Sequence, residues 1–214
     1  MEKIFVKYLN KFLNLYFFAY PKQFVPDLYR FYSQIVDILN VDIKAKYPHV
    51  EVCSYTEDDL FNLLQLDPNM EAVFLHRLER SIFLKEPEHP LLPFLATLMK
   101  LKTGIELYYS TEIGPGLNIQ HGFGIVIGPR CTIGNNFVVH QGVTIGHKKL
   151  YSPDETIIIG NEVVAFAGAK ILGNVRIGDR AQIGANAVLI TDAEADSLYV
   201  GAPAKKIKTL EQVL

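Results

Sequence analysis

The stretch AGAKILGNVRIGDRAQIGANAVL, residues 167–189, carries an aliphatic residue at every sixth position. A fixed period of six is typical of a hexapeptide β-helix, in which each repeat supplies one short strand and a turn and three repeats make one triangular coil. The aliphatic side chains must point inward, while glycine tolerates the backbone angles at the corners. The period begins near Ile113, and an aliphatic residue followed by glycine recurs at Ile113–Gly114, Ile127–Gly128, Ile133–Gly134, Ile145–Gly146, Ile159–Gly160, Ile177–Gly178 and Ile183–Gly184.

The period is interrupted twice. The six-residue phase that includes Ile125 shifts by two residues and resumes at Ile127, and Ile145 and Ile159 are separated by two repeats plus two residues. The second interruption holds the polar segment HKKLYSPDET, residues 147–156, which a narrow coil has no room to bury. We expect this segment to project as a surface loop, where rigid scaffolds commonly carry binding groups.

The first half of the chain shows helical patterns instead. Apolar residues fall on one stripe of LYRFYSQIVDIL, residues 28–39, which follows a proline and an acidic residue. Thr56 and Asp59 form a candidate capping box, and Asp67–Pro68 begins a further helix. A last helix, LLPFLATLMKLK, is ended by Gly104. These patterns predict a helical domain ahead of the repeats.

The predicted fold class is therefore α+β, with an N-terminal helical domain followed by a parallel β-helix. We place the helical domain at residues 1–103, the β-helix at 104–200 and a C-terminal tail at 201–214. The end coil of a solenoid exposes unpaired strand edges, so we expect the helical domain to cap the β-helix and to support oligomerisation.

Composition indicates an ordinary globular protein. The 214 residues are 49% hydrophobic and 21% charged, with a net charge of −2, which argues against nucleic-acid binding. Cys53 and Cys131 fall in different predicted domains, so we expect free thiols in a reducing compartment. Lysines and asparagines interrupt the apolar start, MEKIFVKYLNKFLNLYFFAYP, and no cleavage site follows. We expect a packed amphipathic helix and a cytoplasmic protein without a transmembrane segment, and contact with a membrane surface stays open.

About half of the chain resembles the hexapeptide-repeat acyltransferases, and within them the serine acetyltransferases. The residues that carry the resemblance are TGIEL (103–107), IGPGLNIQHGFGIVIG (113–128), QGVTIG (141–146), AGAKILGNVRIGDRAQIGANAVL (167–189) and GAPAKKI (201–207). The resemblance implies a left-handed β-helix and a homotrimer, which can pair into a dimer of trimers, with active sites in clefts between neighbouring prisms. It also implies transfer of an acetyl group from acetyl-CoA to a small-molecule hydroxyl acceptor in cysteine biosynthesis, without a metal.

The resemblance places the general base at His121 and its acidic partner at Glu106. A hydroxyl is a poor nucleophile at neutral pH, and a neutral imidazole suits its activation. A carboxylate on the other ring nitrogen fixes the tautomer and stabilises the imidazolium. Glu106 precedes His121 by fifteen residues, close to one coil, so the two side chains can lie on neighbouring levels. His140, about one coil further on, is the rival candidate for the base. The alternative interpretation of His121 is a solvent-exposed corner residue without a catalytic role.

For CoA, the resemblance points to the backbone near Ala167 and Ala185, to Gly146 at the start of the loop, and to Lys205 and Lys206 near the nucleotide phosphates. Ordinary coil packing is the alternative for the alanines, and a solvated tail is the alternative for the lysines. Where the family carries a Gly-Gly-Thr segment, this chain has Gly146-His147-Lys148, a departure at the CoA contacts.

Further departures concern the acceptor. We assign Asp67, Gln120 and Glu155 to the acceptor site. Serine acetyltransferases carry an aspartate where Gln120 stands, and an Arg-His pair where Glu155 and Thr156 stand. Replacing a cation with a glutamate would repel a carboxylate rather than bind it. Serine is the acceptor implied by the family, a sugar hydroxyl is the alternative, and a catalytically idle trimeric scaffold is the third reading. The residues after the repeats lack the tail that docks into cysteine synthase, so we expect no such partnership.

Overall fold

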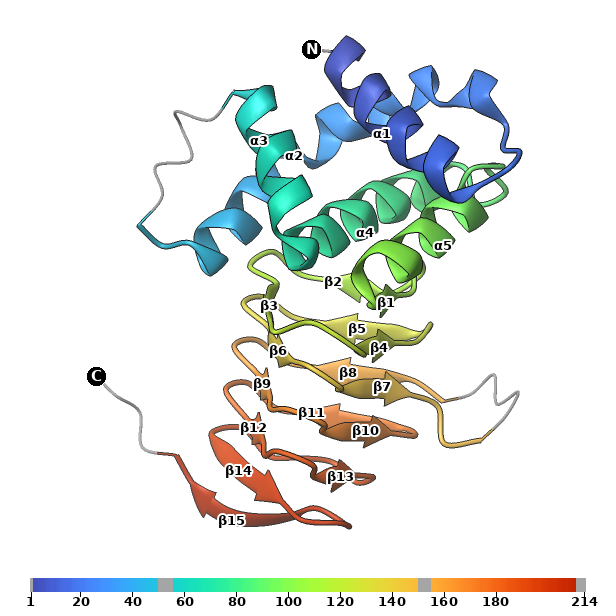
Figure 1. The fold of residues 1–214 in the computed structure, drawn as a ribbon. Helices are drawn as coiled ribbons and strands as arrows, with labels where there is room; N and C mark the ends of the chain where they lie inside the picture. Colours follow the sequence, from blue (N-terminus) through green and yellow to red (C-terminus); the bar gives the residue numbers. More distant parts are fainter. Residues whose placement is uncertain (1, 50–55, 150–154, 211–214) are drawn as a thin grey trace.

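The computed structural model describes residues 2–49, 56–149 and 155–210. Its first part is helical, and Figure 1 shows these helices gathered above a stack of short strands, with α4 and α5 nearest the strands. Of the described helices, none has the length and apolarity needed to cross a bilayer. The helices are α1 (Glu2–Tyr16), η1 (Lys22–Phe24), η2 (Pro26–Leu28), α2 (Tyr29–Lys46), α3 (Glu57–Leu66), α4 (Pro68–Lys85) and α5 (Leu92–Thr103).

Local capping explains where several helices begin and end. The predicted capping box is confirmed, because the Thr56 hydroxyl accepts the backbone N–H of Asp59 and the Asp59 carboxylate accepts that of Thr56. Asp67 caps α4, and its side chain accepts the N–H groups of Asn69 and Met70. Gly104 ends α5 in the left-handed conformation, at φ +67°, which glycine adopts without strain.

Three parallel sheets form the second part of the molecule, and each receives every third strand until the end of the stack. The sheet orders are β1-β4-β7-β10-β13, β11-β8-β5-β2 and β15-β14-β12-β9-β6-β3, and among the described strands only the β14–β15 pair is antiparallel. The predicted α+β fold with a left-handed parallel β-helix is confirmed. The strands are β1 (Glu106–Leu107), β2 (Glu112–Ile113), β3 (Asn118–Gln120), β4 (Val126–Ile127), β5 (Cys131–Ile133), β6 (Val138–His140), β7 (Thr144–Gly146), β8 (Ile157–Ile159), β9 (Val164–Ala165), β10 (Lys170–Leu172), β11 (Val175–Ile177), β12 (Gln182–Ile183), β13 (Val188–Leu189), β14 (Ser197–Val200) and β15 (Lys205–Thr209).

The repeated aliphatic residues fill the inside of the coils. Ile119, Val139, Ala165, Ile183 and Tyr199 are in register across five strands of the six-stranded sheet, and all five are buried. Burying one large aliphatic side chain stabilises the fold by about 1.5–3 kcal/mol. The stack of such residues therefore accounts for the rigidity of the coils, on which the corner residues are displayed.

A buried ion pair joins the helices to the first coil. The Arg77 guanidinium on α4 donates to both carboxylate oxygens of Asp42 on α2, at 2.8 and 3.0 Å. Asp42 also accepts the N–H groups of Gly116 and Leu117, at 2.8 and 2.9 Å, and Arg77 donates to the carbonyl oxygens of Ile113 and Gly114. The helical part thus supplies hydrogen-bonding partners to the end coil.

Two more buried polar groups on α4 lack such partners. Neither ring nitrogen of His76 and neither carboxyl oxygen of Glu79 makes a hydrogen bond with the described residues. Burial raises the pKa of Glu79 well above its usual value, and burial with the nearby Arg77 lowers the pKa of His76 to about 3. Both side chains are therefore neutral in the folded protein at neutral pH.

Glu79→Gln should stabilise the protein increasingly as the pH rises. In the unfolded chain Glu79 ionises above about pH 4.3, whereas the folded protein keeps it protonated. Because the folded pKa is raised, wild-type stability is greatest below that pH and falls by about 1.4 kcal/mol per pH unit up to the folded pKa. Urea unfolding at several pH values checks this, with the exposed Glu88→Gln as control. A gain in the free energy of unfolding that is the same at every pH would contradict this prediction.

Candidate active site

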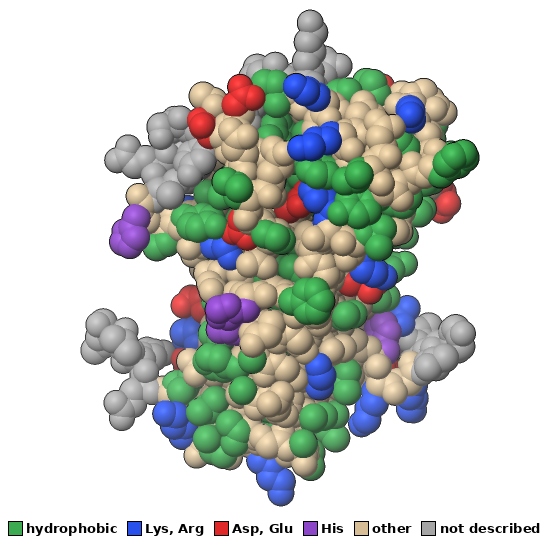
Figure 2. Space-filling model, in the orientation of Figure 1, with side chains coloured by type: hydrophobic (Ala, Val, Ile, Leu, Met, Phe, Trp, Pro, Cys, Tyr) green, Lys and Arg blue, Asp and Glu red, His purple; other side chains and the backbone are tan. Residues whose placement is uncertain are grey.

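His121 occupies a corner of the first coil. It follows β3 directly and adopts φ +60°, and its backbone carbonyl accepts the N–H of Phe123 at 2.7 Å. The side chain is exposed at the edge of the prism. In the space-filling view, histidine side chains lie on the surface at the level of β3 and β6, just below the helices (Figure 2). A substrate can therefore reach the predicted base.

His140, the rival base, lies one coil further along the same edge. It pairs in register with Gln120, and its ring centroid is 6.4 Å from that of His121. On its other side the ring stacks on Phe166 at 5.4 Å. Burial lowers the pKa of His140, and the neighbouring His121 lowers it further. His140 is thus a neutral, partly packed imidazole, and His121 is the more exposed of the two.

The edge continues below the histidines with small residues. Backbone hydrogen bonds link successive corners. Gly168 N–H donates to Gln141 O at 2.8 Å, and Asn186 N–H donates to Ala167 O at 2.9 Å. Ala167 and Ala185 lie two residues beyond the ends of β9 and β12, in the same six-stranded sheet as β3. Their own backbone N–H groups donate to no described residue. The edge therefore offers backbone donors beside small side chains.

The predicted phosphate-binding lysines lie at the far end of that sheet. Lys205 and Lys206 begin β15, the last strand in the sheet order, and both are exposed. The Lys206 ammonium pairs with Glu194 at 2.6 Å. His121, the two alanines and the two lysines therefore lie on, or just beyond, strands of a single sheet.

Other predicted residues lie elsewhere in the single chain. Gly146 ends β7, in the five-stranded sheet, and a Cβ added to it would meet nothing within 4 Å. Glu155 accepts the N–H groups of Lys148 and Lys149, at 2.7 and 3.5 Å, and so holds together the described ends of the predicted loop. Residues 150–154 of that loop lie outside the described residues, as does Cys53. Within the single chain, the structure does not bring Gly146 or Glu155 to the edge that carries His121.

Glu106 has a different partner from the one expected. It lies on β1 in the five-stranded sheet, and its carboxylate pairs with Lys100 at 2.9 Å. Among the described residues, it makes no hydrogen bond to His121. The chain just before Glu106 does touch the His121 turn, since Gly104 O accepts the N–H of Gly124 at 2.9 Å. The dyad of Glu106 and His121 stays a prediction.

The beginning of α4 packs on the turn that follows His121. A Cβ on Gly122 would lie 1.9 Å from the Asn69 side-chain oxygen, and the backbone there adopts φ +43°, so this position favours glycine. Asn69 belongs to the first turn of the helix that Asp67 caps. This contact places the first turn of α4, which Asp67 caps, against the turn that contains His121 and Gly122.

Lys46, at the end of α2, was not expected from the sequence. Its ammonium donates to the carbonyl oxygen of Ile119 at 2.7 Å and lies 3.6 Å from an Asp67 carboxylate oxygen. On the same strand, Asn118 donates to Ala45 O at 3.1 Å, and Gln120 donates to the Asn118 side chain at 2.7 Å. The cluster forms because α2 packs on β3. A lysine near the end of a helix does not indicate in the sequence which distant residue it will contact.

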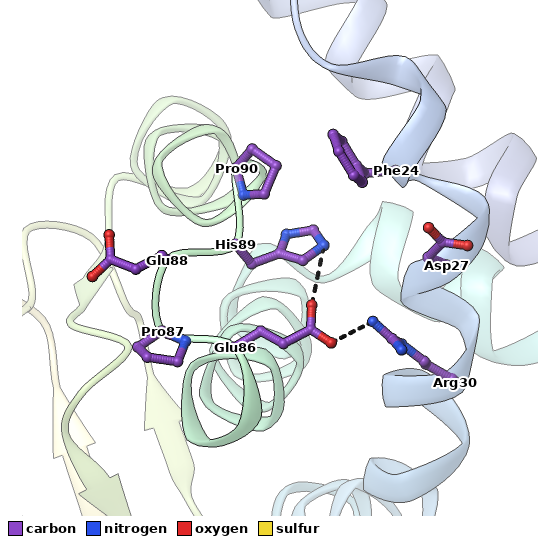
Figure 3. Close-up of a pocket in the computed structure, with 8 residues that line it drawn as sticks. All are labelled: Phe24, Asp27, Arg30, Glu86, Pro87, Glu88, His89 and Pro90. Carbon is purple, nitrogen blue, oxygen red and sulfur yellow. Dashed lines mark hydrogen bonds and ion pairs between the residues drawn. The ribbon is translucent and has the colours of Figure 1, made fainter.

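The pocket drawn in Figure 3 has a different location. It measures about 370 Å³ and lies between the segment 24–30 and the turn joining α4 to α5. Within it, His89 and Arg30 both face Glu86, at 4.0 and 2.5 Å. It holds none of the predicted site residues, so we assign the site to the prism edge. Its lining residues are Phe24, Asp27, Arg30, Glu86, Pro87, Glu88, His89 and Pro90.

Comparison with known proteins points to acyl transfer as the class of reaction. Residues 156–191 match the bacterial transferase hexapeptide family (six repeats). Serine acetyltransferase of Helicobacter pylori (strain J99) is 38% identical over 147 residues, which are 69% of this chain and 85% of the relative. The chain belongs to the serine acetyltransferase family. It is therefore an acyltransferase.

Other members of the serine acetyltransferase family show the same likeness. The enzyme of Synechococcus elongatus is 36% identical over 141 residues, covering 65% of this chain and 57% of the relative. The crystal structure of Neisseria gonorrhoeae serine acetyltransferase superposes with a TM-score of 0.80 at 27% identity, covering 99% of this chain and 80% of the other. A second Neisseria structure, in complex with serine, superposes with a TM-score of 0.78 at 28% identity, covering 97% of this chain and 84% of the other. The resemblance stated from the motifs is thus confirmed.

Proposed function

We propose that this chain transfers the acetyl group of acetyl-CoA to a hydroxyl group, with His121 as the general base. The observation that carries the proposal is the exposed imidazole of His121 at the head of an edge of small residues. Serine is bound in the Neisseria structure at 28% identity, so serine is the first acceptor to test. The reaction would take place in the cytoplasm, as part of cysteine biosynthesis if serine is the acceptor.

The chemistry follows from the position of the imidazole. The neutral ring of His121 takes the hydroxyl proton as the acceptor oxygen attacks the thioester carbonyl. The tetrahedral intermediate then collapses, the C–S bond breaks, and the imidazolium returns the proton to the CoA sulfur. Glu106 would orient the imidazole after exchanging its Lys100 partner for His121. No metal is required for these steps.

The free backbone donors support a position for acetyl-CoA along the edge. The N–H groups of Ala167 and Ala185 are available to the amide oxygens of the pantetheine arm, since they donate to no described residue. Lys205 and Lys206 would attract the nucleotide phosphates at the end of the same sheet. Gly146, at another corner of the prism, would contact CoA from a neighbouring copy.

A trimer would complete the site. Next to His121 the chain exposes two apolar side chains, Phe123 at 76% and Val126 at 37%. A second copy packed on this face would cover them and form a cleft at the edge. Sedimentation velocity should give a mass of at least three chains, and a monomer at micromolar concentration would contradict the trimer.

Release of the CoA thiol tests the proposed function. Purified protein is mixed with acetyl-CoA and with serine, homoserine, amino sugars or neutral sugars, and the free thiol is measured over time. Acceptor-dependent release supports the transfer. If CoA binds but no acceptor is acetylated, the chain is a scaffold that has kept only the binding site.

A further inference from the structure

We propose that Lys46 determines acceptor specificity by neutralising Asp67, so that the site takes an uncharged polyhydroxyl acceptor such as a sugar rather than a zwitterionic amino acid. This inference rests on the proposed function for the identity of the site. It goes further because it names the class of acceptor and the residue that selects it.

The first step is the position of Lys46. Its ammonium lies 2.7 Å from the carbonyl oxygen of Ile119, two residues before His121. The side chain is only 11% exposed, and that of Asp67 is 12% exposed. An ion pair in this partly buried setting is weakly screened by salt. The cation is therefore a fixed part of the wall beside the predicted base.

The second step is the state of the Asp67 carboxylate. One oxygen accepts the N–H groups of Asn69 and Met70, at 2.9 and 3.4 Å. The other accepts the Tyr47 hydroxyl at 2.5 Å and faces the Lys46 ammonium at 3.6 Å. Both oxygens are occupied, and the charge is compensated. Asp67 is thus poorly placed to bind the ammonium group of an amino acid.

The third step is what the edge offers in its place. Gln120 presents a neutral amide whose N–H₂ donates once, to Asn118 at 2.7 Å, and whose oxygen can accept from a hydroxyl group. The Phe166 ring stacks on His140 on the same edge. Apolar ring faces with a few neutral polar groups suit the C–H and hydroxyl surfaces of a sugar.

Charge alone then decides between the two acceptor classes. An amino acid brings an ammonium and a carboxylate, and each loses water on binding, whereas the only charges described beside His121 in this chain, Lys46 and Asp67, already pair with each other. A neutral polyol avoids that cost. Removing the Lys46 charge would leave Asp67 uncompensated and would favour an ammonium-bearing acceptor.

The test compares wild type, Lys46→Met, Lys46→Arg and the exposed Lys44→Met with acetyl-CoA. The acceptors are L-serine and the methyl glycosides of glucose, galactose and N-acetylglucosamine. We expect kcat/KM of the wild type to be at least about 10-fold higher for one glycoside than for serine, a difference that one compensated charge can supply. Lys46→Met should lower that ratio by about 10-fold or more, whereas Lys46→Arg and Lys44→Met should keep it.

Acceptor binding, measured by saturation-transfer NMR in the presence of CoA, separates this inference from the proposed function. If a glycoside binds better than serine but no thiol is released, the transfer fails while the specificity stands. If serine binds or reacts better than every glycoside, the inference is overturned. It is also overturned if Lys46→Met changes kcat/KM for serine and for the glycosides by the same factor, because Lys46 would then have only a structural role.

Discussion

Replacing His121 with alanine should lower kcat by about 10²–10⁴-fold and leave the affinity for CoA nearly unchanged. The imidazole is the exposed ring at the corner after β3, and its removal takes away the proton acceptor for the attacking hydroxyl. The backbone N–H groups proposed to hold CoA lie lower on the same edge and do not depend on this side chain. Thiol release gives kcat, and calorimetric titration gives the affinity for CoA.

Two further variants make this expectation specific. His49→Ala removes an exposed imidazole from the helical part, and it should leave kcat within about twofold of wild type. His140→Ala removes a ring that packs on Phe166 at 5.4 Å. If His140→Ala, and not His121→Ala, abolishes turnover while CoA still binds, then His140 is the base.

Arg77→Met should destabilise the protein by about 3–5 kcal/mol. The substitution leaves the Asp42 carboxylate buried with two backbone N–H groups but without its cation, and it removes the donors to Ile113 O and Gly114 O. Urea unfolding measures the change in the free energy of unfolding.

The control for Arg77 is an exposed pair on the same helical part. Arg30 contacts Glu86 at 2.5 Å, but the two side chains are 56% and 38% exposed. Arg30→Met should therefore cost less than about 1 kcal/mol. If Arg77→Met lowers the free energy of unfolding as little as Arg30→Met does, the buried pair does not join the helices to the first coil.

The sequence allowed prediction of those parts of the fold that depend on local patterns. A six-residue aliphatic period gives the coils, because each inward position is repeated one coil later. The beginnings of α3 and α4 follow from the capping residues Thr56 and Asp67, and the end of α5 follows from Gly104. These residues act on their nearest neighbours in the chain. These features require no knowledge of distant contacts.

The contacts between distant segments could not be predicted in this way. Lys46 lies beside Ile119, and Asp42 beside Arg77, only because α2 packs on β3 and α4. Charged side chains at helix ends are usually solvated, so their pattern indicates no partner. For the same reason the Lys100–Glu106 pair could not be predicted, since a spacing of one coil does not indicate which cation lies near a carboxylate.

The last strand has a consequence for solubility. A stack of parallel coils ends in unpaired backbone groups, which invite the next molecule to continue the stack into a fibre. In the six-stranded sheet, β15 runs backwards along β14 and places the exposed Lys205, Lys206 and Lys208 there (Figure 1). A reversed strand with clustered positive charge repels an identical neighbour. We therefore expect this reversed strand to hinder end-to-end stacking of the six-stranded sheet.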